Sequence, residues 1–222
     1  MVGPDGTTTS LRNGCTDDTY YFFEKLPGYS TLRFLLCKAC FLVEGDSDEL
    51  IVQRAYMDSH NGRLPIQDGI EVISVGNSGS RFLQLADAVS QFAVALTDND
   101  GNIEARENQY KAYSLLGKGK PDEDARVAVS FPERLLNRGS IDGYSYNTLE
   151  PELVEANGVD CVNQILRKSY NTRDNLLQYM KSHKTECAYE FFKTSTEVNW
   201  PDYITRAIDF IDRAVVMSRK LV

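Results

Sequence analysis

The 222-residue chain has the composition of a globular protein, with 42% hydrophobic and 25% charged residues. Its net charge of −8 argues against a generally basic nucleic-acid coat. No apolar run approaches the ~20 residues that span a bilayer, and the N-terminal stretch MVGPDGTTTS lacks the basic and hydrophobic regions of a signal peptide. Five scattered cysteines indicate no disulfide framework. We therefore expect a cytoplasmic protein without a membrane segment.

The first part of the chain alternates apolar strands with helices. After a leader and lead-in segment at 1–34, strands are predicted at about 37–43, 70–76, 92–97 and 126–132. Helices are predicted between the first three of these strands, one at about 47–59 and one after the Gly/Ser loop GNSGS at 76–80. Strands and helices that alternate through short connections are typical of a parallel sheet with crossover helices. The sequence therefore predicts an α/β core over 35–150.

From Glu150 onward the pattern changes to helices alone. Apolar residues recur at helical spacing in the segments 149–158, 162–169, 173–194 and 201–222. Pro201 stands at the start of the last segment, where helices tolerate proline. The apolar stripe of that segment, which we interpret as core packing, consists of Tyr203, Ile204, Ala207, Ile208 and Ile211. We expect 151–222 to form a helical part that packs on the α/β core or completes it.

Acidic residues follow two of the predicted strands at the point where each strand ends. Glu44 follows the first strand in FLVEGDSDEL, and Asp98 and Asp100 follow the third in VALTDNDG. Asp48 falls in the first turn of the helix predicted at 47–59, close to Glu44. Because the carboxyl ends of parallel strands meet at one edge of a sheet, these acids should lie together. Carboxylates packed together need a cation, and oxygen ligands in this number suit Mg²⁺ or Mn²⁺.

Several of these features have plainer interpretations when taken alone. Asp46 and Glu49 are interpreted as acids that the helix dipole favours at a helix start. An isolated Asp-x-Asp is most often a solvated turn. The stretch DNDGNIEARENQ resembles a calcium-binding loop, but Gly101 stands at loop position 4 instead of 6, and Gln109 occupies the place of the bidentate Glu.

The combined pattern resembles a known family. A strand, Glu and Gly, followed about fifty residues later by a strand and Asp-x-Asp, resembles the Toprim domain of topoisomerases, primases and some nucleases. The segments LVEGDSDELIVQRAY, VISVG, VALTDNDG, NTLEPEL, KTECAYEFF and PDYITRAIDFI, in this order, resemble the C-terminal region of the overcoming-lysogenization-defect (OLD) nucleases. Proteins of that family join an ABC-type ATPase domain to a Toprim domain with helical additions, and they cut DNA with two divalent metals.

The resemblance also implies partners and the role of single residues. It implies DNA as substrate and a function in antiphage defence or DNA processing. It also implies an ATPase domain or subunit as partner, since these 222 residues contain no GxxxxGK[ST] phosphate loop. The implied ligands of two Mg²⁺ or Mn²⁺ ions are Glu44, Asp48, Asp98, Asp100, Thr148 and Glu150. The implied catalytic residues are Glu44 and Lys184, the latter offsetting charge on the phosphate. Ca²⁺ is expected to inhibit or to share the site. The loop GNSGS departs from the bulkier residue expected after VISVG, so no substrate contact is predicted there.

The predicted function is a metal-dependent DNA endonuclease or nickase that hydrolyses phosphodiesters by a two-metal mechanism. The alternative is a non-enzymatic, metal-binding Toprim module that binds DNA or assembles with an ATPase partner. Glu150 separates the two, because a binding module has no need of an acid and a hydroxyl that complete a second metal site. Nucleotidyl transfer, as in primases, is a third alternative, but no second catalytic domain or zinc ribbon supports it.

Overall fold

The computed structural model describes residues 11–25, 28–117, 124–136 and 147–218. Its centre is an all-parallel sheet of five strands in the order β2-β1-β3-β5-β4. The strands are β1 (Ala39–Val43), β2 (Ile70–Ser74), β3 (Phe92–Leu96), β4 (Ser114–Leu115) and β5 (Val127–Ser130). The central strands β1 and β3 are buried along their whole length, which explains their uninterrupted apolar sequences ACFLV and FAVAL. The predicted α/β fold with a parallel sheet is confirmed.

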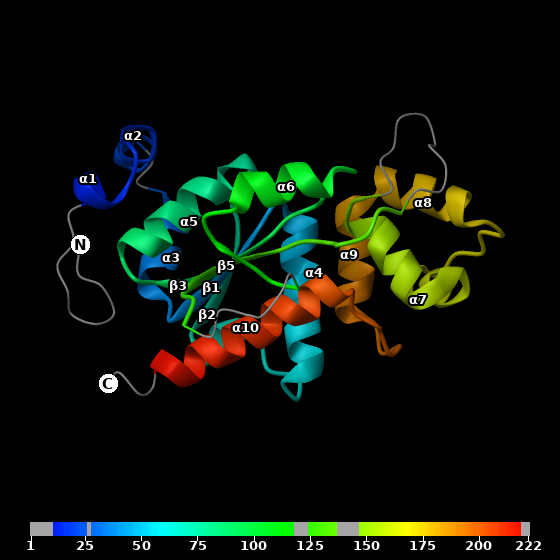
Figure 1. Ribbon diagram of the computed structural model, residues 1–222. Helices are drawn as coiled ribbons and strands as arrows, with labels where there is room; N and C mark the ends of the chain where they lie inside the picture. Colours follow the sequence, from blue (N-terminus) through cyan, green and yellow to red (C-terminus); the bar gives the residue numbers. More distant parts are fainter. Residues whose placement is uncertain (1–10, 26–27, 118–123, 137–146, 219–222) are drawn as a thin grey trace.

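Helices cover both faces of this sheet (Figure 1). On one face lie α3 (Tyr29–Leu36) and α5 (Gly79–Ala88), and on the other lie α4 (Asp46–Ser59) and α10 (Asp202–Ser218). The stripe predicted as core packing in α10 is buried, and the helix contacts β1, β3 and β5. The last helix of the chain therefore returns to the sheet and completes the cover of the face that it shares with α4.

The remaining C-terminal helices form a layer outside α4 (Figure 1). They are α7 (Leu149–Leu166), α8 (Arg173–Ser182) and α9 (Lys184–Lys193), with α9 packed along α4 and α7 packed on α8 and α9. Gly158 has a φ of 78° and kinks α7, so the two helices predicted at 149–158 and 162–169 are the two arms of one kinked helix. The helix predicted at 173–194 is divided at His183, which ends α8 and precedes α9.

The elements that the sequence did not predict are short or weakly apolar. The predicted leader and lead-in segment at 1–34 contains the helices α1 (Leu11–Gly14) and α2 (Asp17–Lys25) and most of α3. The first ten residues of this segment and the last four residues of the helix predicted at 201–222 lie outside the described part. The helix α6 (Ile103–Tyr110) is mostly polar, and β4 has only two residues. Two 3₁₀ turns, η1 (Pro65–Asp68) and η2 (Gly76–Ser78), flank β2. None of the described helices combines the length and the apolar content needed to cross a membrane.

Candidate metal centre

The acids predicted from the sequence gather at the carboxyl edge of the sheet. Glu44 follows β1, and Asp98 and Asp100 follow β3. Asp48 lies in the first turn of α4, and Thr148 and Glu150 stand at the start of α7. The strand register explains part of this arrangement. Leu42 of β1 pairs with Ala95 of β3, so Glu44 and Thr97 lie level with each other two residues further on. Parallel pairing thus brings the end of FLVE next to the end of VALTD.

The pKa values of Asp48 and Asp98 are raised by burial and by neighbouring carboxylates. Burial, followed by the charges of Glu150 and Glu44, raises the pKa of Asp48 to about 7. Burial also raises the pKa of Asp98, to about 9, and the largest further contributions come from Asp48 and Glu44. The ordinary value for both groups is 3.8. Burial and neighbouring negative charge thus both disfavour the ionised forms of Asp48 and Asp98, and a bound cation would favour them.

Hydrogen bonds orient two of the carboxylates. The Oε1 atom of Glu44 accepts a hydrogen bond from the Thr97 hydroxyl and one from the backbone N–H of Asp98, at 3.3 Å. The Oδ2 atom of Asp48 accepts a hydrogen bond of 3.0 Å from the backbone N–H of Gly45, which closes the first turn of α4. A carboxylate has two oxygens and several lone pairs, so a helix cap does not exclude ligation by the same side chain. Thr97, which the sequence reasoning did not select, supports Glu44.

Lys184 lies beside the acid cluster, as the resemblance implied. Its Nζ atom is 3.4 Å from Oε1 of Glu150, whose side chain is only 4% exposed. The Thr148 hydroxyl donates a hydrogen bond of 3.2 Å to Oε2 of the same carboxylate. Lys184 is the first residue of α9, and the packing of α9 along α4 holds it near the start of α7. The helical layer thus supplies a positive charge to an acidic edge.

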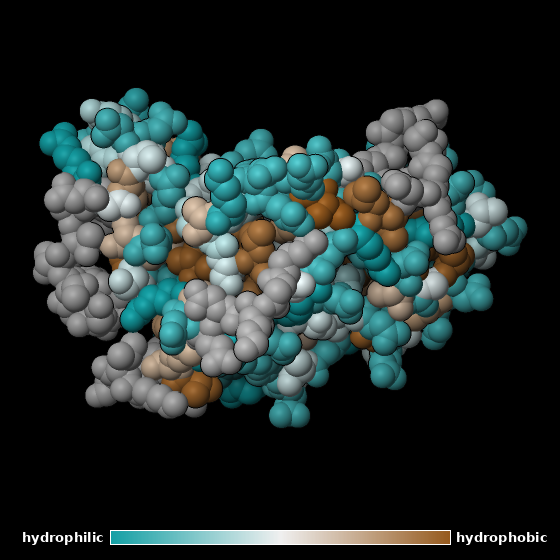
Figure 2. All heavy atoms as spheres, in the orientation of Figure 1, coloured by the Kyte–Doolittle hydropathy of each residue, from teal (hydrophilic) through white to brown (hydrophobic). Residues whose placement is uncertain are grey.

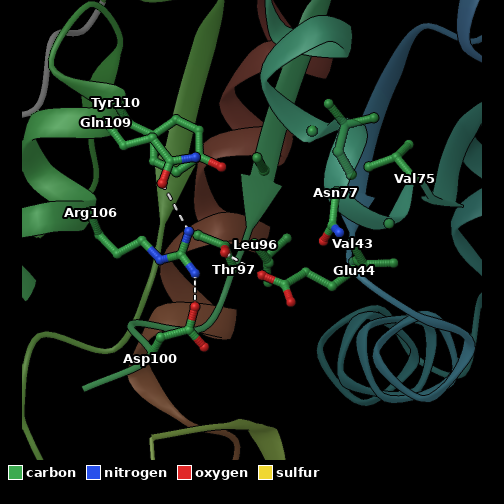
Figure 3. Close-up of a pocket in the computed structure, with 14 residues that line it drawn as sticks. Val43, Glu44, Val75, Asn77, Leu96, Thr97, Asp100, Arg106, Gln109 and Tyr110 are labelled. Carbon is green, nitrogen blue, oxygen red and sulfur yellow. Dashed lines mark hydrogen bonds and ion pairs between the residues drawn. The ribbon is translucent and has the colours of Figure 1, made fainter. Parts of the chain in front are cut away.

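Asp100, like Glu150, is already paired with a cationic side chain. It is exposed, it has a left-handed φ of 49°, and its carboxylate forms an ion pair with Arg106 of α6. Arg106 also donates a hydrogen bond of 2.9 Å to Oε1 of Gln109 (Figure 3). The sequence reasoning missed Arg106 because it did not predict α6. The available signal was Asn102, whose side chain accepts from the N–H of Ala105 and caps that helix.

The side chains of this site have the oxygen atoms that a hard divalent cation prefers, but they are not spaced as its ligands. Among the described residues, no three His, Cys, Asp or Glu side chains are already spaced as metal ligands. The groups present are nevertheless carboxylate and hydroxyl oxygens, which Mg²⁺ and Mn²⁺ prefer. The neighbouring carboxylates that contribute to the raised pKa values of Asp48 and Asp98 also create a negative potential, which attracts a divalent cation. Binding would require these side chains to move closer together.

Comparison with known proteins agrees with this arrangement. Residues 35–100 match the model of the "Overcoming lysogenization defect protein-like, TOPRIM domain". This segment is an OLD-like Toprim domain. Glu44, Asp48, Asp98 and Asp100 lie inside the matched range, whereas Glu150 and Lys184 lie outside it. None of the curated proteins matches the chain.

Solved structures extend the likeness of the Toprim domain over most of the chain. The C-terminal region of the Xanthomonas campestris pv. campestris OLD protein is 20% identical, with a TM-score of 0.55, and the match covers 85% of this chain and 98% of that one. The C-terminal region of the Burkholderia pseudomallei OLD protein is 19% identical, with a TM-score of 0.56, over 81% of this chain and 98% of that one. At these identities the likeness concerns the fold, including the helices added to the Toprim core.

Proposed function

We propose that the chain is a divalent-metal-dependent DNA endonuclease or nickase of the OLD type. The observation that carries this proposal is the gathering of buried carboxylates at one edge of the sheet, where burial and, after it, the charges of neighbouring carboxylates raise the pKa of Asp48 to about 7 and that of Asp98 to about 9. A fold that needs only stability gains nothing from such a cluster, because each carboxylate weakens the ionisation of its neighbours. A site that binds divalent cations needs this surplus of negative charge.

Each residue of the site has a proposed role. The proposed ligands are Glu44, Asp48, Asp98, Asp100, Thr148 and Glu150. When bound, a pair of Mg²⁺ or Mn²⁺ ions would polarise the scissile phosphate and activate a water molecule for attack on it. Glu44, oriented by Thr97 and by the Asp98 N–H, would be both a ligand and a catalytic residue. Lys184, half exposed beside Glu150, would stabilise the negative charge that builds on the phosphate during cleavage.

The proposal includes the partners of the nuclease. Both solved relatives are C-terminal regions of OLD proteins, so a further region accompanies this fold in those proteins. We propose that an ATPase domain or subunit acts with the present chain, that DNA is its substrate, and that the complex serves antiphage defence.

A plasmid-cleavage assay tests the proposed activity. Supercoiled plasmid is incubated with the protein in Mg²⁺, Mn²⁺, Ca²⁺ or EDTA, and nicked and linear products are separated on a gel. We expect cleavage in Mg²⁺ or Mn²⁺, none in EDTA, and slower or inhibited cleavage in Ca²⁺. Glu44→Ala should abolish cleavage, whereas Glu104→Ala, an exposed acid in the first turn of α6, should leave it unchanged. Undiminished nicking by the Glu44→Ala protein would rule out the assignment.

One observation favours the second candidate, a metal-binding module that acts only with a partner. Among the described residues no three acids are spaced as ligands, and the Glu150 carboxylate already contacts Lys184 and Thr148. A protein that binds Mn²⁺ and DNA but leaves plasmid intact under every condition above would support the module. Cleavage that appears with the chain alone would support the nuclease.

A further inference from the structure

A cavity of about 270 Å³ opens beside the acid cluster at the carboxyl edge of the sheet (Figure 3). Its polar lining comes from the ends of β1 and β3, from the loop after β2 and from α6: Glu44, Asn77, Thr97, Asp100, Arg106 and Gln109. Two of the proposed metal ligands, Glu44 and Asp100, therefore face this cavity. Asp48 and Asp98 lie on the other side of β3's end, against α10.

The loop GNSGS leaves the cavity open toward β2. Gly76, Asn77 and Gly79 line this side, and Gly76 has a left-handed φ of 53° that favours glycine. A Cβ atom added at Gly76 would meet nothing within 4 Å, so the space beside this glycine is open. The small residues that depart from the expected bulkier residue after VISVG thus make room for a ligand next to Glu44.

Arg106 gives the cavity its positive charge. It is the only cationic side chain among the described residues that line the cavity, and its side chain is 18% exposed. Asp100 and Gln109 hold the guanidinium from two sides, with Glu44 across the cavity (Figure 3). A guanidinium has five N–H donors, so these two partners leave capacity for an anionic ligand. Arginine is also the side chain whose planar fork best matches a phosphate.

The position of this cation relates it to a DNA strand. A strand whose scissile phosphate lies at the proposed metal ligands carries a further phosphate on each neighbouring nucleotide. Without Arg106, the only charged side chains among the described residues that line the cavity would be Glu44 and Asp100, and both would repel the strand. Ligation of Asp100 to a metal would also release the guanidinium from its present partner for contact with a phosphate.

We propose that this cavity is a subsite for a non-scissile phosphate of the DNA strand, the phosphate adjacent to the cleaved bond, and that Arg106 binds it. This proposal rests on the proposed nuclease function. The plainer role of Arg106 is to neutralise Asp100 and hold α6 in place. That structural role involves no DNA. Measuring DNA binding and its salt dependence therefore distinguishes it from the proposed phosphate contact.

The test measures binding of the full chain to a fluorescein-labelled duplex of about 20 bp by anisotropy, in Ca²⁺ and at salt concentrations of about 50 to 200 mM. We expect Arg106→Ala to weaken binding about 3- to 10-fold and to reduce the slope of log K against log salt by about 1, as loss of one phosphate contact does. Arg106→Lys should keep most of the slope. The matched control is Arg63→Ala, since Arg63 is also paired with an Asp, at 2.6 Å, but at the amino edge of the sheet. It should change neither quantity.

Kinetics give a second readout. A contact to a non-scissile phosphate acts equally on bound substrate and transition state, so Arg106→Ala should raise KM for plasmid nicking and leave kcat nearly unchanged. The melting temperature of each variant shows whether it is folded. A folded Arg106→Ala protein with wild-type affinity and slope overturns the subsite.

The outcomes also separate this proposal from the nuclease proposal. Wild-type nicking together with a wild-type slope for Arg106→Ala overturns the subsite alone. A reduced slope for Arg106→Ala in a protein that never nicks overturns the nuclease and leaves the phosphate contact standing. A wild-type chain that neither binds nor nicks DNA overturns both.

Discussion

Acidic residues at the two edges of the sheet have pKa values that are shifted in opposite directions. At the amino edge, Asp68 precedes β2 and is bound by Arg63 at 2.6 Å and by the Tyr56 hydroxyl at 3.1 Å, and the hydrogen bond from Arg63 lowers its pKa. At the carboxyl edge, burial and neighbouring carboxylates raise the pKa of Asp48 and of Asp98. The amino edge therefore neutralises its acid with its own side chains. At the carboxyl edge no such pairing lowers the pKa of Asp48 or Asp98, and a divalent cation could replace the protons that these two buried groups bind.

The largest contrast between the edges should be seen in activity. We expect Asp98→Ala to lower plasmid nicking by roughly 100-fold or more, because it removes a carboxylate from the centre of the proposed metal site. Asp68→Ala, the matched change at the amino edge, should leave nicking unchanged in the protein that remains folded. Gel assays of the two variants at equal concentration measure the difference. Equal effects on nicking would remove the distinction between the edges.

Lys184, whose ammonium pairs with Glu150 at the carboxyl edge, should affect the rate of cleavage. Lys184→Ala should lower kcat about 10- to 100-fold with a small change in KM, if Lys184 stabilises charge in the transition state. Lys193→Ala, which removes the partner of Glu190 at the other end of α9, is the matched control and should have no effect. Michaelis–Menten measurements on plasmid distinguish the two. A rise in KM alone would instead assign Lys184 to DNA binding.

Divalent metal should stabilise the carboxyl edge. At a Mn²⁺ concentration about 100 times the dissociation constant, one site adds about 2.7 kcal/mol, and a chain of this size gains roughly 2–4 °C in melting temperature per kcal/mol. We expect a rise of several degrees for the wild type and for Asp68→Ala, and a much smaller rise for Asp98→Ala. Thermal unfolding with and without Mn²⁺ measures this. An equal rise in all three proteins would place the bound metal elsewhere.

The smallest expected effect is on the pH dependence of the metal-free protein. The folded-state pKa values of Asp48 and Asp98 lie above the ordinary 3.8, at about 7 and 9, so the folded protein binds more protons than the unfolded chain in this range. Stability in EDTA should therefore fall as pH rises from about 4 to 9. Asp98→Asn should flatten this fall and raise the melting temperature at pH 8 by about 2–4 °C. Identical profiles for the two proteins would contradict the charge surplus.

Much of the fold could be predicted from local sequence patterns. The continuous apolar runs of β1 and β3 and the stripe of α10 follow directly from burial on both faces of a sheet and on one face of a helix. The helix α6 and the strand β4 could not be predicted, because IEARENQY has no apolar face and two residues give no period. The division of 173–194 at His183 depends on how α9 packs along α4, which is tertiary information.

The candidate site shows the same limits. Strand ends and parallel pairing are enough to bring Glu44 and Asp98 together, because both follow central strands of one sheet. Lys184 could be related to Glu150 only through the family resemblance, since its position depends on the packing of three helices far apart in sequence. Arg106 was missed for a different reason. Its partner Asp100 was predicted, but the helix α6, which carries Arg106 next to Asp100, was not.

The most direct test of the central claim is calorimetric titration of the metal-free protein with Mn²⁺. If the carboxyl edge of the sheet is a divalent-metal centre, wild-type protein and Asp68→Ala should each bind two Mn²⁺ ions in coupled steps. Asp98→Ala should lose most of this binding, since its carboxylate lies among Glu44, Asp48 and Glu150. Absence of binding to the wild type, or equal binding by Asp98→Ala, would contradict the account.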